Sequence, residues 1–252
     1  MRIPALLLLA ATAFAVDLPK DPKAVVLSYD EVGGYGPART RKAPWVTVLA
    51  DGTVRVPPFR AGAKDLEMKL GAAALQELMR FVVEKHRFFA FDEKKARAAM
   101  GQGNAMIMDA SSTVISVQVQ GKRKQARFYA LTWAARQHRN VRALQDLSAI
   151  QHRLVNLMAV VRAGGKEAAA KCLALANAEL GKRHPKVKPL LAGDLVSTSR
   201  YADASMVLRF HRYEGPGRYT IASVRRPKDG EPQVELNVRV EVVTGPRPPS
   251  AR

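Results

Sequence analysis

Residues 71–91, GAAALQELMRFVVEKHRFFAF, carry the helical pattern around which the rest of the chain is arranged. Their apolar side chains recur every three or four residues, which places them on one face of an amphipathic helix. These side chains are Leu75, Leu78, Met79, Val82 and Val83. Such a helix must bury that face, and the segments on either side, 45–56 and 113–131, are typical of paired strands. We therefore expect a helix over residues 71–87 that lies across an antiparallel sheet.

Two hairpins are predicted beside this helix. Asp51-Gly52 separates two β-branched runs, and this dipeptide is typical of a two-residue loop with both central residues at positive φ. The segment 113–119 alternates apolar and polar residues before a turn leads into 127–131. A first strand is predicted at 24–29 and a short helix from Asp92. After the second strand of the first hairpin, a polar loop is expected to lead to the 71–87 helix.

A long helix is predicted over residues 141–162, because apolar residues repeat at three-then-four spacing up to Gly164-Gly165. A second helix from Lys166 is followed by three predicted strands near 206–210, 219–221 and 234–242. The predicted class is α+β, with two modules that each pack a helix on an antiparallel sheet. The expected domains are an N-terminal α+β module at 16–164, a C-terminal α+β module at 165–244 and a disordered tail at 245–252. We predict that cleavage after Gly164 leaves two independently folding pieces.

The first fifteen residues match a secretory signal peptide, with Arg2, an apolar run and a small-residue site near Ala15. The run is too short to span a bilayer, so we expect a secreted or periplasmic protein without a transmembrane segment. The formal charge is +19, from 41 Lys and Arg against 22 Asp and Glu. Such a balance favours attraction to polyanions, and it is equally compatible with a solvated basic surface.

The search for catalytic chemistry yields no candidate. No two of the five histidines have the four-residue spacing of metal ligands on a helix. Cys172, the only cysteine, falls within an apolar helical stripe and is predicted to be a buried core residue. The chain has no nucleophile elbow, Walker loop or dinucleotide fingerprint. We therefore expect no enzyme activity, cofactor or metal.

One interval, between Asp109 and Asp146, contains no acidic residue but seven Lys and Arg. These are Lys122, Arg123, Lys124, Arg127, Arg136, Arg139 and Arg142. The first three are predicted to project from a hairpin tip and are candidate binding residues. Phe128 and Tyr129 follow nearby, but strand alternation turns them to opposite faces, so at least one belongs to a core. The interval predicts a basic edge for anionic polymers or acidic partners, with no specific nucleic acid.

From Val26 to about Val161 the order of features resembles emfourin-type bacterial domains, which inhibit thermolysin-like metalloproteases. The matching features are a strand followed by a Gly-Gly-aromatic turn, a strand pair, a helix that ends in Phe88-Phe89, a later strand pair and a closing helix. The resemblance implies that Gly33, Gly34 and Tyr35 are motif positions.

Residues 166–243 resemble a cystatin-type unit, in which one helix precedes a curled antiparallel sheet. Papain inhibitors of that family carry Gln-x-Val-x-Gly in the first hairpin and Pro-Trp in the second. Here these places hold Ser199-Arg200-Tyr201-Ala202-Asp203 and Pro227-Lys228-Asp229-Gly230. The resemblance implies the fold without that inhibitory wedge, and Arg200 and Tyr201 are candidate binding residues at the tip.

Three functions are compatible with these observations. The leading hypothesis is an exported, non-enzymatic protein that binds another protein, such as a protease, through its hairpin tips. The second is a basic envelope protein that binds anionic polymers. The third is a hydrolase, which the absence of a titratable cluster disfavours.

Overall fold

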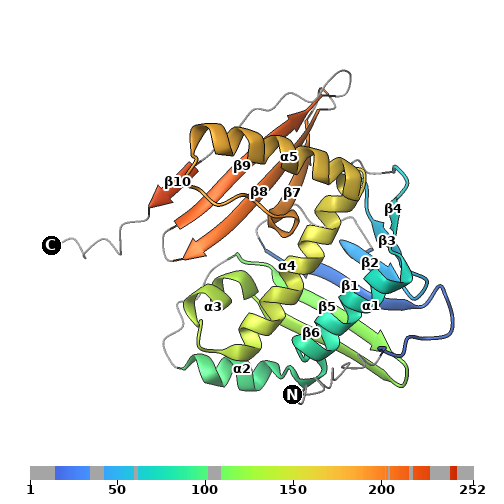
Figure 1. Cartoon of the computed structure of the whole chain (residues 1–252). Coiled ribbons are helices and arrows are strands. Elements are labelled where there is room, and N and C mark those ends of the chain that lie inside the picture. The colour runs from blue at the N-terminus through green and yellow to red at the C-terminus, as the bar shows by residue number, and fades with distance from the viewer. Residues whose placement is uncertain are drawn as a thin grey trace, which may run out of the picture.

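A computed structural model describes residues 15–34, 43–59, 62–101, 109–201, 203, 205–215, 218–227 and 239–242. Two antiparallel sheets with helices packed on them confirm the predicted α+β class (Figure 1). Most of the predicted signal peptide, Tyr35 and the predicted tail lie outside the described residues. Among the described residues, no helix is long and apolar enough to cross a membrane.

The first sheet has six strands in the order β4-β3-β2-β1-β5-β6. They are β1 (Val25–Val32), β2 (Val46–Leu49), β3 (Thr53–Val56), β4 (Leu66–Lys69), β5 (Ser112–Val119) and β6 (Lys122–Tyr129). Both predicted hairpins are present, as β2–β3 and β5–β6. β4 was not predicted, because its four residues LEMK alternate apolar and polar over too short a stretch to stand out, and none of them is buried at this edge of the sheet.

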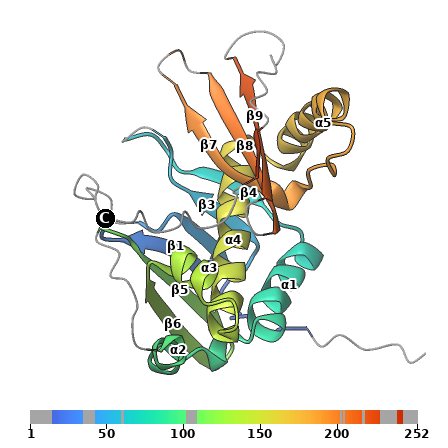
Figure 2. The same cartoon turned by 90° about the vertical axis from the view of Figure 1, so that its left-hand side faces the viewer.

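The helices of this part are α1 (Ala72–Arg80), α2 (Glu93–Met100), α3 (Leu131–Gln137) and α4 (Arg142–Arg162). A π-helical turn, Phe81–Lys85, continues α1, and a 3₁₀ turn, Phe88–Ala90, follows it. The side chain of Asp92 caps α2 by accepting the backbone N–H of Lys95 at 3.0 Å. α1 and α4 lie on the same face of the first sheet (Figure 2). The helices predicted over 71–87 and 141–162 are thus confirmed, whereas α3 was not predicted.

The second sheet has the strand order β10-β9-β8-β7. Its elements are α5 (Lys166–Arg183), the 3₁₀ turn Ala192–Asp194 (η3), β7 (Leu195–Arg200), β8 (Met206–Gly215), β9 (Arg218–Arg226) and β10 (Arg239–Val242). α5 covers one face of this sheet (Figure 2). β7 was not predicted, because LVSTSR is mostly polar and buries only Leu195 and Thr198. Residues 234–238, in the third predicted strand, lie outside the described part of the chain.

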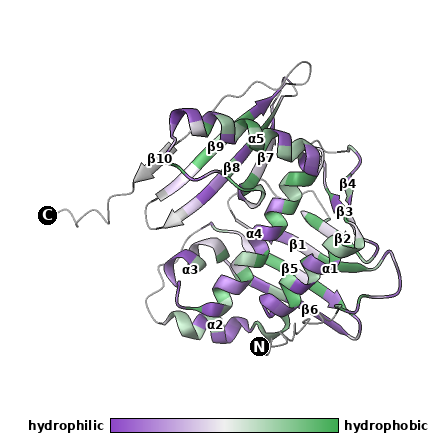
Figure 3. Ribbon diagram, viewed as in Figure 1, coloured by the Kyte–Doolittle hydropathy of each residue, from purple (hydrophilic) through white to green (hydrophobic). Residues whose placement is uncertain are grey.

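Two hydrophobic clusters form the core. The first joins the inward residues of β1, β2, β3, β5 and β6 to α1 and α4, and it contains Leu78, Met79 and Phe128. The second joins α5 to β7, β8 and β9, and it contains Cys172 and Phe210. α4 runs between the two sheets, and its apolar residues stand out in green in Figure 3. Cys172 is 1% exposed, as predicted.

α4 contributes to both clusters. Leu147, Ile150 and Leu154 belong to the first, whereas Ala159 and Ala163, at and just beyond its last turn, belong to the second. The second cluster therefore begins before Gly164-Gly165. The boundary predicted at that pair stays a prediction, and α4 is the element that the two modules share.

The β2–β3 turn differs from the predicted two-residue loop. Among the described residues, Gly52 has φ +86°, but Asp51 is not among the residues at positive φ. The N–H of Gly52 donates to the carbonyl of Leu49 at 2.9 Å, so Ala50, Asp51 and Gly52 all lie in the turn. This arrangement is typical of a three-residue loop that ends in a left-handed glycine. The Asp51 carboxylate accepts a hydrogen bond from the N–H of Thr53 at 2.8 Å, and this exposed contact stabilises the turn.

Candidate functional site

The residues predicted to bind a partner lie at three separate places. Gly33 and Gly34 follow β1, where Val32 pairs with Ser112 at the start of β5. Lys122 pairs with Val119 at the other end of β5. The length of an eight-residue strand therefore separates the glycines from the basic tip.

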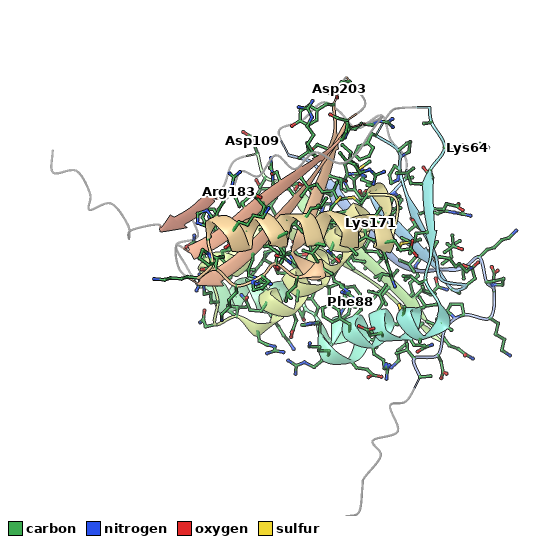
Figure 4. The ribbon with its side chains drawn as sticks, turned by 45° about the horizontal axis from the view of Figure 1, so that its top comes forward. Lys64, Phe88, Asp109, Lys171, Arg183 and Asp203 are labelled. Atoms are coloured by element: carbon green, nitrogen blue, oxygen red, sulfur yellow. The ribbon has the colours of Figure 1, made fainter. Side chains whose placement is uncertain are left out.

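Arg200 and Tyr201 lie at the end of β7, in the second sheet. Tyr201 is 53% exposed, and its backbone N–H donates to the carbonyl of Ser205. The guanidinium carbon of Arg225 lies 5.9 Å from the centroid of the Tyr201 ring. Figure 4 labels Asp203, at this turn, and Phe88, in the first module, far from each other. The structure does not bring the three groups together into one surface.

Lys124 is engaged inside the protein. Its ammonium donates to the carbonyl of Phe89 at 2.8 Å and also to the carbonyl of Phe91. Its side chain therefore ties β6 to the turn after α1. Lys122 and Arg123 remain exposed at the tip of the hairpin.

A groove of about 810 Å³ lies between α3, α4 and the turn of residues 81–86 on one side and the η3–β8 region on the other. Its lining is strongly basic. The basic and imidazole side chains in it are those of Lys85, His86, Arg136, Arg139, His152 and Arg153. One acidic residue, Asp194, lines it, and that carboxylate is paired with Arg212 at 2.8 Å. The groove therefore has an excess of positive charge.

Short-range contacts around α3 position the arginines of the groove. The side-chain amide of Gln145, on α4, donates to the carbonyls of Ala135 and His138 at 2.7 and 3.3 Å. These two bonds hold the C-terminal end of α3 against α4, because carbonyls at a helix end lack intrahelical partners. Arg136 and Arg139, on either side of that end, are held at the groove and remain exposed.

Tyr213, on β8, forms the facing wall. Its ring centroid lies 5.4 Å from the guanidinium carbon of Arg139, and its hydroxyl accepts a hydrogen bond from Arg139. This contact joins the two modules across the groove. Cation–π contacts of this type contribute on the order of 0.5–1 kcal/mol at exposed sites.

A histidine–aspartate pair lies where the groove meets a smaller pocket. His86 Nδ1 lies 2.9 Å from Asp146 Oδ1, and Arg142 Nε donates to Oδ2 of the same carboxylate at 3.1 Å. Burial raises the pKa of Asp146, but the hydrogen bonds from His86 and Arg142 outweigh it and lower the pKa below its ordinary value. Asp146 is therefore held as a carboxylate in a nearly buried site.

This pair lacks the other components of a nucleophilic site. Within the described residues, no hydroxyl or thiol is hydrogen-bonded to His86, and burial raises the pKa of the Cys172 thiol. No group of three or more His, Cys, Asp or Glu that could hold a metal ion occurs in the described ranges. The groove can bind and orient anions, because its exposed side chains are hydrogen-bond donors and cations.

Comparison of the chain with protein-family models, with curated proteins and with solved structures finds no match. The resemblances to emfourin-type and cystatin-type domains remain hypotheses based on the order of elements.

The groove was not predicted from the sequence, where Lys122, Arg123 and Lys124 were the candidate binding residues of the basic interval. Arg136 and Arg139 fall within the acid-free interval, which was the signal that could have found them. Lys85, His152 and Arg153 come from two other segments, and nothing local distinguishes them from ordinary solvated residues.

Proposed function

We propose that this protein is a non-enzymatic binding protein that holds a segment of an anionic polymer in the groove between its two modules. The observation that supports this most is the charge of the groove, where four Lys and Arg side chains face a single acidic residue that already has a partner. Field lines of like-charged groups concentrate in a cleft with protein walls, and this raises the local concentration of an anionic ligand.

The exposure of these cations favours a ligand from solution. Lys85, Arg136 and Arg139 are all exposed, so each can approach a phosphate or carboxylate without breaking the core. At physiological ionic strength the screening length is about 8 Å, so only groups close to the ligand contribute strongly. The proposal therefore predicts binding that weakens as salt is added.

The test uses the full chain and a long-chain polyphosphate as the probe. We expect the double variant Lys85→Gln/Arg136→Gln to weaken polyphosphate binding about tenfold, which corresponds to about 1.4 kcal/mol. The matched control is Lys122→Gln/Arg123→Gln, which removes the same charge from the exposed hairpin tip. If both double variants lose affinity equally, the basic surface as a whole attracts the polymer and the groove proposal is wrong.

A protein partner is the second candidate, and the exposure of Tyr201 favours it. An exposed tyrosine beside Arg200 and Arg225 suits the centre of a protein interface, where tyrosine and arginine are enriched. The separation of the three predicted tips makes this candidate weaker than the groove. Capture of one partner by the chain, lost on Tyr201→Ala and retained by the groove double variant, would favour the protein partner. Export of the protein, with cleavage near Ala15, belongs to both proposals.

A further inference from the structure

A second cavity, of about 340 Å³, lies where α4 meets α5, the β4–α1 region and the η3–β8 region. Its walls are mostly apolar, and both modules contribute to them. Representative wall residues are Leu70, Leu78, Leu157, Leu173, Leu195 and Phe210. Small-molecule sites are concave, mainly apolar and about 300 Å³ or larger, with a few polar groups that fix orientation.

This apolar cavity adjoins the basic groove. Arg153, Asn156 and Gly193 line both of them. Arg153 and Asn156 are three residues apart on α4, so they lie on neighbouring positions of the same helix face. The structure therefore places an apolar space and a cationic space on two sides of one short stretch of α4.

Asn156 holds the wall between the two spaces in place. Its side-chain amide donates to the carbonyl of Ala192 at 2.8 Å and to that of Leu195 at 2.9 Å. These bonds fasten η3 and the start of β7 to α4, although no residue of η3 is itself buried. The wall is therefore anchored to α4 by polar contacts.

Two of the polar groups at the cavity, Arg153 and Lys166, are cations. Lys166, at the start of α5, is exposed and lines the cavity, and no acidic partner is found for it in the described part of the chain. Glu77 is the acidic residue in the lining, 71% exposed and paired with Arg153 at a distance of 3.7 Å. A long and exposed ion pair of this kind is weak, so an anionic ligand can compete for Arg153.

We infer that the cavity and the adjoining end of the groove together form a site for an amphiphile with one acyl chain and an anionic head. The acyl chain of the ligand occupies the apolar cavity, and its anionic head lies at Arg153. The inference rests on the proposed function in one respect, because the head uses a cation of the same groove. A cationic head is disfavoured, since Arg153 and Lys166 flank the cavity.

The test measures binding to the full chain by calorimetry, with dodecanoate as the probe and dodecyltrimethylammonium as the probe of opposite charge. Both have the same alkyl chain, so the comparison isolates the head. We expect dodecanoate to bind at a single saturable site at least about tenfold more tightly than the cation. Equal affinities would overturn the inference, because they would indicate non-specific apolar adsorption.

Two substitutions on α5 locate the site. Ala170 lines the cavity and is exposed, so Ala170→Trp is expected to fill the opening with little effect on the fold and to weaken dodecanoate binding about tenfold or more. Ala178, also exposed, lies two turns further along and does not line the cavity, so Ala178→Trp is the matched control. If the first variant retains wild-type affinity, or if both lose it equally, the cavity is not the site.

The head position is tested by Arg153→Gln, which we expect to weaken dodecanoate binding several-fold. Polyphosphate binding, measured on the same samples, separates this inference from the proposed function. Loss of dodecanoate binding in Ala170→Trp with unchanged polyphosphate binding supports the inference. Polyphosphate binding without any dodecanoate binding overturns the inference and leaves the groove proposal standing. Dodecanoate binding without polyphosphate binding supports the inference and overturns the polymer proposal.

Discussion

Gly52 is constrained both by its backbone conformation and by a neighbouring carbonyl. Its φ of +86° is rarely adopted by residues with a Cβ, and a Cβ at this position would lie 2.4 Å from the backbone oxygen of Leu70. The N–H of Leu70 donates to the carbonyl of Gly52 at 2.9 Å, so that strand end cannot move away freely. The turn and the segment that leads into α1 are therefore packed directly on each other.

We expect Gly52→Ala to destabilise the protein more than Gly121→Ala. Gly121 lies in the β5–β6 turn at φ +73°, and a Cβ added there would have no other atom within 4 Å, so its replacement costs only the left-handed conformation, about 1–2 kcal/mol. Gly52→Ala adds overpacking against Leu70, which costs about 1–3 kcal/mol more. Urea midpoints measure the difference. Equal shifts would show that the approach of Leu70 carries no energetic cost.

Asp146 makes the stability of the folded protein depend on pH in the acid range. Its folded-state pKa is lowered, so the stabilisation is complete above the unfolded value of about 3.9 and is lost as pH falls through the folded value. We expect Asp146→Asn to lose about 1–3 kcal/mol at pH 7 and to reduce the further loss of stability below about pH 4.

Arg142→Gln is the companion variant, because it removes one hydrogen bond to Asp146 and leaves His86 in place. It is expected to move the pKa of Asp146 part of the way back to its ordinary value and to weaken the pH dependence partially. Denaturant unfolding at a series of pH values measures both variants. If Asp146→Asn loses stability below about pH 4 as steeply as the wild type does, Asp146 is not the source of the pH dependence.

At the scale of elements, the hairpin β5–β6 supports the turn that follows α1. Arg87 adopts a left-handed conformation at φ +41°, and the chain then passes through the 3₁₀ turn at 88–90. No side-chain cap is found for either of these two described turns. The ammonium of Lys124, on β6, donates to two carbonyls of this path, those of Phe89 and Phe91.

We therefore expect Lys124→Met to destabilise the protein by about 1–3 kcal/mol, because the carbonyls of Phe89 and Phe91 lose a charged donor. Lys122→Met, two residues earlier at the exposed tip, is the matched control and is expected to change stability by less than about 0.5 kcal/mol. Thermal unfolding of both variants compares them. Equal and small effects would mean that Lys124 is available to a ligand, as the sequence suggested.

At the scale of the whole molecule, α4 connects the two modules. Ala159 and Ala163 contribute to the second cluster, and a guanidinium nitrogen of Arg226, on β9, donates to the carbonyl of Ala163 at 2.9 Å. At the same end of α4, the guanidinium carbon of Arg162 lies 5.2 Å from the centroid of the Trp45 ring in the first module. The last turn of α4 is thus held from both sides.

This sharing changes the result that we expect from cleavage after Gly164. The piece 16–164 retains the first cluster and is expected to fold. The piece 165–252 lacks the α4 wall of its cluster, so we expect it to unfold without a cooperative transition when alone and to regain one when 16–164 is added. Circular dichroism during heating distinguishes the cases. A cooperative transition of the isolated second piece, at the midpoint found in the intact chain, would support two independent domains.

Local patterns were sufficient for most of the secondary structure. The period of the apolar residues predicted α1, α4 and α5. The Asp51-Gly52 dipeptide predicted the β2–β3 hairpin, and the alternation of apolar and polar residues before a turn predicted the β5–β6 hairpin. Cys172 was expected inside a core, as was at least one of Phe128 and Tyr129, and Cys172 and Phe128 are both buried. These features depend on residues that are near one another in the chain, so the sequence expresses them directly.

Tertiary structure decided the edges and the candidate site. β4 is a four-residue edge segment and β7 is mostly polar, and both become strands through pairing with β3 and β8. The groove gathers cations from α3 and its C-terminal end, from α4 and from the turn at 81–86, and residues of the second module form its facing wall. Electrostatic potential and cavities depend on distances in space, and residues that are far apart in the chain set those distances. The sequence therefore determined that the protein is basic and α+β, and only the fold decided where its charge gathers.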